Sequence, residues 1–108
     1  MGIVWDRGYW HANNLNQCIA DCTSYRKPDL NIIDAYAVMK KNGPRGVSKA
    51  DISLFKSQII STDIVSADAA AAKLFGIEPE NISFIKLASQ MKLGRMDLSK
   101  LNINRIIL

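Results

Sequence analysis

Apolar residues form three short runs along the chain and repeat with a helical period in three longer segments. Residues 30–39 are apolar apart from a few polar positions, chief among them Asp34, and residues 55–61 form a second run around Ile59 and Ile60. A third run lies at residues 103–108. Runs of this length, rich in isoleucine and bounded by turn residues, predict β-strands.

The three helical segments are expected at residues 10–25, 64–75 and 79–93. In the first, Leu15, Cys18, Ile19 and Cys22 have the i, i+3, i+4, i+7 spacing of one apolar stripe. The second follows the capping cluster Ser61-Thr62-Asp63 and ends at Gly76, and the third begins at Pro79 and ends at Gly94.

Helices that separate strands are typical of an α/β fold. We therefore expect a small parallel or mixed sheet of about three strands packed with three helices, with at least one right-handed crossover. The length of 108 residues suits a single domain spanning residues 1–108.

Asp34 stands out because it interrupts the run that is apolar on both faces. Such a strand is usually central and covered by helices, and an ionised carboxylate is costly to bury without a partner. The interpretation we favour is a structural hydrogen-bond network. The alternative is a functional carboxylate.

Two further carboxylates could join Asp34. Asp63 begins the second helix, and Asp68 lies on the stripe that carries Ile64, Ala71 and Phe75. Three converging carboxylates could hold a divalent ion or relay protons, which makes Asp34, Asp63 and Asp68 candidate catalytic residues. Helix capping alone would explain Asp63, and we favour that structural interpretation.

A basic turn follows the first strand at Asn42-Gly43-Pro44-Arg45-Gly46. Free backbone N–H groups beside cations can hold an anion, so Gly43, Arg45 and Gly46 are candidate anion-binding residues, with Lys40, Lys41 and Lys49 nearby. The Gly-Lys-Ser/Thr ending of a phosphate-binding Walker loop is missing. A solvated basic turn is the interpretation that we favour.

His11 shares the first helical stripe with Cys18 and Cys22. In a continuous helix, His11 and Cys18 would lie about 10 Å apart along the axis, too far for one coordination sphere. We predict core cysteines and no metal site in this chain.

Composition limits the function further. The net charge is +4, and basic residues are scattered without an aromatic ladder, so nucleic-acid binding is not indicated. No secretory signal or membrane-spanning run is visible, which predicts a cytoplasmic protein. The aromatic load of Trp5, Tyr9 and Trp10 suggests that part of the chain is missing upstream, and the apolar final residues suggest truncation or a tightly docked end.

Four segments together resemble the family called domain of unknown function 362. They are Gln17-Cys18-Ile19-Ala20-Asp21, Pro28 to Ala35, Asn42 to Gly46 and Ser61 to Ala69, and the resemblance covers most of residues 11–94. Ser66 departs from the alanine that is common in the family.

The resemblance implies an uncharacterised protein, often longer and often associated with iron–sulfur clusters. It places this chain in the C-terminal part and any cluster upstream, because Cys18 and Cys22 match no cluster motif. The family positions at His11, Asp34, Gly43, Pro44, Asp63 and Asp68 become candidates without assigned roles.

The sequence therefore leaves two alternative functions. In the first, the chain is the C-terminal subdomain of a redox-related protein, and its acidic residues and Gly-Pro loop form a site together with the remainder of the parent chain. In the second, it is a non-catalytic structural or protein-interaction module. A weaker third option is an anion- or nucleic-acid-binding module built on Lys40, Lys41, Arg45 and Lys49.

Overall fold

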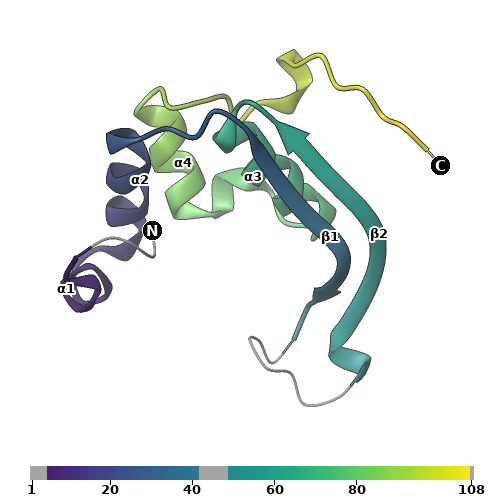
Figure 1. Cartoon of the computed structure of the whole chain (residues 1–108), viewed down its shortest axis with the longest axis horizontal. Helices are drawn as coiled ribbons and strands as arrows, with labels where there is room; N and C mark the ends of the chain where they lie inside the picture. The colour runs from purple at the N-terminus through teal and green to yellow at the C-terminus, as the bar shows by residue number, and fades with distance from the viewer. Residues whose placement is uncertain (1–4, 42–48, 108) are drawn as a thin grey trace.

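The computed structural model describes residues 5–41 and 49–107. These residues form an α/β arrangement with four α-helices and one two-stranded sheet (Figure 1). The elements in chain order are α1 (Arg7–Ala12), α2 (Leu15–Tyr25), β1 (Asn31–Met39), β2 (Ile52–Ser61), α3 (Ile64–Leu74) and α4 (Ser83–Gln90). Short 3-10 turns occur at Lys49–Asp51, Pro79–Asn81 and Leu98–Lys100.

The sheet is antiparallel, so the expected parallel pair with a right-handed crossover is wrong. Asn31 pairs with Ser61 at one end and Met39 with Ile52 at the other. The Lys40 amide donates to the Asp51 carbonyl over 2.8 Å beyond the last pair. A parallel crossover needs a long connection that usually contains a helix, whereas residues 40–51 carry no helical pattern.

A bulge divides the hairpin into two halves. Ala35 pairs with Ser57 and Ala37 with Leu54, so one residue of β1 faces two residues of β2. Lys56, at the bulge, has a left-handed φ of 49°. Bulges bend strands and increase their twist. The ribbon is visibly curved, with one half beside α3 and the other extending away from the helices (Figure 1).

The predicted third strand is also wrong. Residues 101–107 form no strand, and Ile106 and Ile107 are 83% and 95% exposed. The isoleucine-rich run satisfied the local preference for extended backbone, but strand preference mostly reflects packing against neighbours. Nothing among the described residues pairs with this segment.

Two of the three predicted helices are divided. Asn13 and Asn14 interrupt the segment expected at 10–25, and the Asn14 side chain accepts from the Gln17 amide over 3.3 Å to begin α2. Asparagine favours such caps because its side chain competes for backbone hydrogen bonds. In the segment expected at 79–93, a 3-10 turn precedes α4, which ends before Met91.

The second helix is confirmed. α3 ends at Leu74, and Gly76 follows with a left-handed φ of 79°, as expected of a residue just beyond a helix.

The core lies between the helices. Its fully buried members, contributed by α2, α3 and α4, are Ala20, Val65, Ala72, Ile85 and Ala88. Alanine is prominent among them, and small side chains let helix backbones approach closely. α3 also packs against both strands, so it joins the helical layer to one face of the sheet.

A polar clamp fastens the segment after α4 to the first turn of α3. The Asp63 carboxylate accepts from the Arg95 amide over 2.9 Å, and the Ser66 hydroxyl donates to the Arg95 carbonyl over 2.7 Å. Both backbone groups of Arg95 are thereby bound by the start of α3. Gly94 passes so close that an added β-carbon would overlap the Asp63 carboxylate and lie 2.9 Å from the β-carbon of Val65.

Gly94→Ala should therefore destabilise the protein by about 1–3 kcal/mol, the usual cost of overpacking a tight contact. Gly8→Ala is the matched control, because nothing lies within 4 Å of a β-carbon at Gly8 in α1. This control should be neutral or stabilising by up to about 1 kcal/mol, as alanine replaces glycine in a helix. Urea unfolding of both variants measures the difference, and equal stabilities would refute the close approach.

Candidate functional site

The structure separates the candidate residues instead of gathering them. Asp34 lies on β1, Asp63 and Asp68 belong to α3 and its cap, and His11 lies on α1. Within the described ranges, no group of three or more histidine, cysteine or acidic side chains could hold a metal ion. Each candidate therefore has to be considered in its own surroundings.

Asp34 is exposed, so the expectation of a buried carboxylate is wrong. Its carboxylate accepts from the Tyr36 amide over 2.9 Å. The neighbouring Ala35 is buried on the face that α3 covers, and Asp34 points to the opposite face because strand side chains alternate. In the described part of the chain, helices cover one face of the sheet and leave the other open, which the apolar run of β1 did not reveal.

Asp63 is a helix cap with a tertiary role. One oxygen of its carboxylate accepts from the amides of Val65 and Ser66 over 2.9 and 3.0 Å, and the other oxygen binds Arg95 in the clamp. Burial by itself would raise the pKa of Asp63. The hydrogen bonds from Ser66, Arg95 and Val65 outweigh burial and lower this pKa. These oxygens are engaged with backbone amides, as the favoured structural interpretation of Asp63 requires.

Asp68 has different surroundings. It is half-buried in the wall of a small pocket between three helices, and this burial raises the pKa of its carboxyl group. It accepts no hydrogen bond from any residue in the part of the chain that the structure describes. We call this cavity the Asp68 pocket; it is lined by Ile19, Ala20, Thr23, Ile64, Val65, Asp68, Phe84, Ile85 and Ala88.

The sequence predicted only one wall of the Asp68 pocket, the one that α3 contributes. The helical stripe shared by Ile64 and Asp68 did indicate a carboxylate on an apolar helix face. The walls contributed by α2 and α4 depend on how the helices pack, and that information is not local in the sequence. The geometry suits binding of a small polar group next to apolar walls.

His11 and the two cysteines lie on different helices. His11 is exposed on α1, whereas Cys18 and Cys22 are half-buried on α2 with free thiols. The break at Asn13 and Asn14 ends the continuous stripe on which the three residues were expected. This arrangement gives His11 no partner among the described residues with which to perform acid–base chemistry.

The predicted anion site at Gly43, Arg45 and Gly46 falls outside the described residues and stays a prediction. Of the nearby cations, Lys41 and Lys49 are exposed, and the Lys40 ammonium lies 5.3 Å from the centre of the Phe55 ring. That distance is typical of a cation–π contact.

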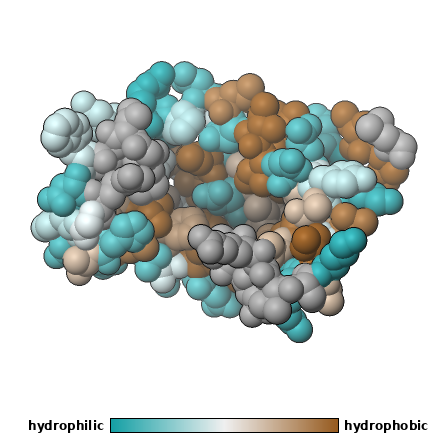
Figure 2. Space-filling model, turned by 60° about the horizontal axis from the view of Figure 1, so that its bottom comes forward, coloured by the Kyte–Doolittle hydropathy of each residue, from teal (hydrophilic) through white to brown (hydrophobic). Residues whose placement is uncertain are grey.

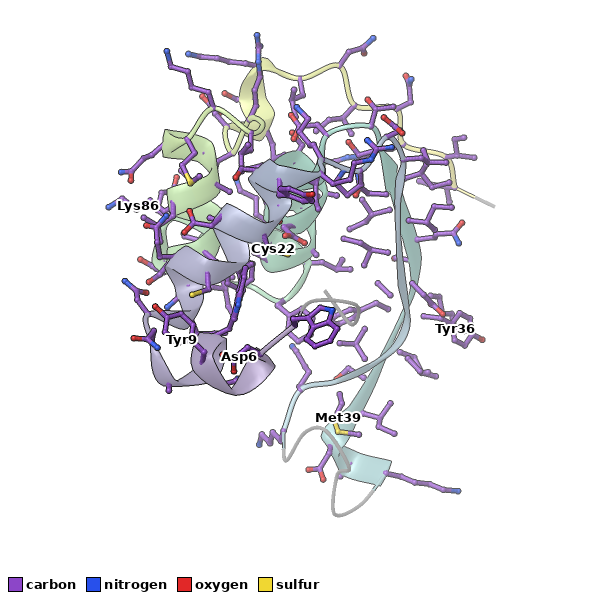
Figure 3. All side chains as sticks on the ribbon, turned by 60° about the vertical axis from the view of Figure 1, so that its left-hand side comes forward. Asp6, Tyr9, Cys22, Tyr36, Met39 and Lys86 are labelled. Carbon is purple, nitrogen blue, oxygen red and sulfur yellow. The ribbon has the colours of Figure 1, made fainter. Side chains whose placement is uncertain are left out.

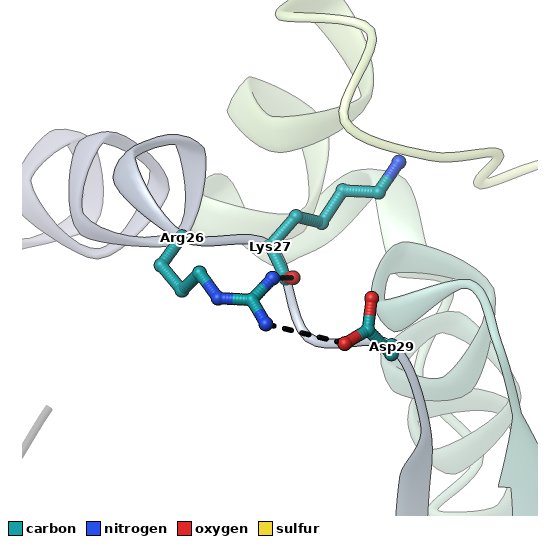
Figure 4. Close-up of polar contacts among 3 residues, drawn as sticks. All are labelled: Arg26, Lys27 and Asp29. Carbon is teal, nitrogen blue, oxygen red and sulfur yellow. Dashed lines mark hydrogen bonds and ion pairs between the residues drawn. The ribbon is translucent and has the colours of Figure 1, made fainter.

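An exposed ion pair lies at the other end of β1. Arg26 binds Asp29 over 3.2 Å and also donates to the Lys27 carbonyl over 3.1 Å, as Figure 4 shows. Both charged side chains are largely in solvent, where such a pair contributes little stability. It shapes the turn between α2 and β1 and forms no part of a site.

The second feature that the sequence pattern missed is the uncovered face of the sheet. We call it the open sheet face and define it by the apolar residues Ile32, Tyr36 and Ile60, which are 58%, 56% and 62% exposed. Ile32 and Ile60 are cross-strand partners, and Asp34 pairs with Gln58 on the same face. Figure 3 shows Tyr36 pointing away from the helices. In Figure 2, hydrophobic groups reach the surface among hydrophilic ones.

The alternation in β2 was a usable signal for this face. Every second residue from Lys56 to Ile60 is exposed, while the residues between them are half-buried. This pattern indicates a strand with one covered and one open face. The apolar character of Ile60 concealed the pattern, because exposed positions of soluble sheets are usually polar.

Asp63→Ala should cost about 1–2 kcal/mol of stability at pH 7, because the helix loses its cap and Arg95 its partner. A lowered folded-state pKa stabilises the fold above the unfolded value of about 3.9 and loses that contribution as pH falls through the folded-state pKa. The difference in free energy of unfolding between wild type and variant should therefore become smaller as the pH falls. Urea unfolding from pH 3 to 7 measures it.

Asp97→Ala is the control for Asp63→Ala. Asp97 also caps a turn, accepting from the Ser99 amide over 3.0 Å, but that turn is local and exposed. Asp97→Ala should therefore lower the stability of the protein clearly less than Asp63→Ala does. Equal losses at Asp63 and Asp97 would contradict a tertiary role for Asp63.

Asp68→Asn should stabilise the protein at pH 7 by up to about 1 kcal/mol, because it removes a half-buried charge that has no partner among the residues the structure describes. A raised folded-state pKa gives full stability below the unfolded value of about 3.9, and that stability is lost as pH rises through the folded-state pKa. The stabilities of wild type and variant should therefore be similar at acid pH and differ increasingly toward neutral pH. Thermal unfolding between pH 3 and 7 tests this, and a destabilised variant at pH 7 would show that the carboxylate has a stabilising partner.

The described helices include none long and apolar enough to cross a membrane. No match was found among curated proteins or among solved structures. The family described as a domain of unknown function (DUF362) matches residues 1–73, a range that begins earlier than the expected resemblance and ends inside α3. Because this range is more than half of the chain and includes both strands and Asp34, Asp63 and Asp68, the chain belongs to the DUF362 family.

Proposed function

We propose that this chain is a non-catalytic protein-interaction module of the DUF362 family, and that the open sheet face is its contact surface. The observation that carries the proposal is the exposure of Ile32, Tyr36 and Ile60 on one face of a sheet whose other face packs against α3. Clustered apolar side chains at a surface, rimmed by polar ones, are typical of protein interfaces.

The surroundings of the apolar residues suit a protein partner. Asp34, Lys56 and Gln58 lie on the same exposed side of the strands and supply both signs of charge and an amide. A central aromatic or aliphatic group with a polar rim is the usual anatomy of an interface. Burial of one exposed isoleucine or leucine side chain contributes about 1.5–3 kcal/mol.

The partner that we propose is the remainder of a longer parent chain of the same family. Both strands of the open sheet face lie within the residues that match the family, so this surface belongs to the family's common part. An apolar sheet face that lies beside a packed helical layer is suited to joining two parts of one protein.

The competing proposal is a catalytic subdomain of a redox-related parent. One observation favours it, namely the raised pKa of Asp68 in a pocket, since perturbed carboxyl groups are common in active sites. The separation of Asp34 and Asp63 from Asp68 weighs against the three-carboxylate site expected from the sequence. Two cysteines on one helix do not fit an iron–sulfur cluster, which usually needs four ligands, so a cluster would belong to other parts of the parent.

The test places a photo-crosslinking amino acid at Tyr36, in the open sheet face, and at Lys86, an exposed position on α4 (labelled in Figure 3). The labelled protein is produced in its native cell. Tyr36 should crosslink to one defined polypeptide segment that is then identified by mass spectrometry, whereas Lys86 should not.

The identified segment is next produced and titrated against the purified chain. Ile60→Lys should weaken binding by about 10–100-fold, the equivalent of one lost apolar side chain. Lys86→Glu is the matched surface control and should leave binding unchanged. No crosslink at Tyr36 above the level at Lys86, or equal affinity of Ile60→Lys and wild type, would overturn the proposal.

A further inference from the structure

The polar side chains that line the Asp68 pocket can only accept further hydrogen bonds. Its polar side chains are those of Asp68 and Thr23, and all other residues of its wall are apolar. The Thr23 hydroxyl donates its hydrogen to the Ile19 carbonyl over 3.0 Å, within α2. A hydroxyl has one hydrogen and two lone pairs, so Thr23 can offer only acceptor positions to a further group.

Asp68 adds a second acceptor. Its carboxylate receives no hydrogen bond from the described residues, and its oxygens keep some contact with solvent, because every fully buried side-chain oxygen among the described residues has a partner. The two polar side chains that line the pocket are thus a carboxylate and a hydroxyl whose hydrogen is already donated. The pocket therefore repels anions, and its side chains offer no hydrogen-bond donor to a group that can only accept hydrogen bonds.

The size of the pocket narrows the choice further. Its volume is about 20 Å³, which is room for one group the size of a water molecule. An ammonium group is of that size and carries three N–H donors. A divalent cation is less suitable, because calcium and magnesium require about six oxygen ligands or more.

The ammonium group would fill the pocket, so an alkyl chain behind it would extend outward along the apolar side chains that line the pocket, among them Ile19, Ile64 and Phe84. Lysine side chains commonly lay their methylene groups along apolar surface while the charged end reaches a polar partner. A cation beside Asp68 would also remove the cost of an ionised carboxylate in apolar surroundings.

We propose that the Asp68 pocket binds a primary ammonium group carried on an aliphatic chain. The source is either the lysine side chain of a protein or a free alkylamine. The proposal rests on the pocket and not on the open sheet face, so it stands or falls separately from the proposed interaction module.

The test is NMR of the 108-residue chain labelled at isoleucine methyl groups. It is titrated at pH 7 with n-butylammonium chloride, with sodium chloride at matched ionic strength, and with 1-butanol as a neutral analogue of the same length. Butylammonium should give saturable shifts at the methyl groups of Ile19, Ile64 and Ile85, whereas sodium chloride should not and butanol should bind at least 10-fold more weakly.

Two variants examine the role of each acceptor. Asp68→Asn keeps the shape of the side chain without its charge and should weaken butylammonium binding at least 10-fold. Thr23→Val should weaken it by less. Asp97→Asn, which removes a charge from an exposed turn outside the pocket, should leave the affinity unchanged.

A second titration distinguishes the two sources. It uses Nα-acetyl-lysine methylamide, which presents the same ammonium group on a peptide unit. Binding at least as tight as that of butylammonium assigns the pocket to a lysine side chain of a protein, and binding of butylammonium alone assigns it to a free amine. Equal shifts with butanol, unchanged affinity in Asp68→Asn, or no saturable shift with either amine would overturn the proposal and leave a pocket for water only.

Discussion

The interaction on which the structure most depends is the clamp between Asp63 and Arg95. One carboxylate begins α3 and also holds the backbone that follows α4. The helical core has few large buried side chains, and its fully buried members are mostly alanine. A core of this kind tolerates little misalignment, because small residues pack well only when the helices approach closely. The clamp sets that approach at one end of α3.

The position of α3 in turn decides which surfaces remain open. α3 packs against the sheet on one side and against α4 on the other, so a helical layer covers one sheet face. The opposite face keeps its isoleucine and tyrosine side chains in solvent. The Asp68 pocket has the same origin, since it is the space left where α2 and α4 meet the first turns of α3. Both proposed binding surfaces therefore follow from one packing arrangement.

Local features of the sequence predicted local features of the structure. The capping role of Asp63, the extent of α3 and the left-handed Gly76 were all readable, because caps and helix ends depend on a few adjacent residues. The break at Asn13 and Asn14 was readable in principle, since paired asparagines favour a cap over a helix interior.

What could not be predicted is non-local. The burial of Asp34 was expected from a run that is apolar on both faces, yet burial depends on whether a second layer covers the sheet. The strand expected at 103–108 failed for the same reason, because a strand needs an edge to pair with. The family resemblance identified the family that the comparison shows, but it located candidate residues without roles. Only the packing separates Asp63, whose oxygens are occupied by amides, from Asp68, whose oxygens accept no hydrogen bond from the described residues.

The central claim is that the candidate carboxylates act separately and share no common site. The most direct test is an NMR titration of the side-chain carboxyl carbons of all aspartates in one sample, repeated with Asp63→Asn. The account predicts single transitions, with the pKa of Asp63 below and the pKa of Asp68 above the ordinary range. The Asp68 curve should not change when Asp63 is replaced. Biphasic, mutually dependent curves for Asp34, Asp63 and Asp68 would show a coupled acidic site and contradict the account.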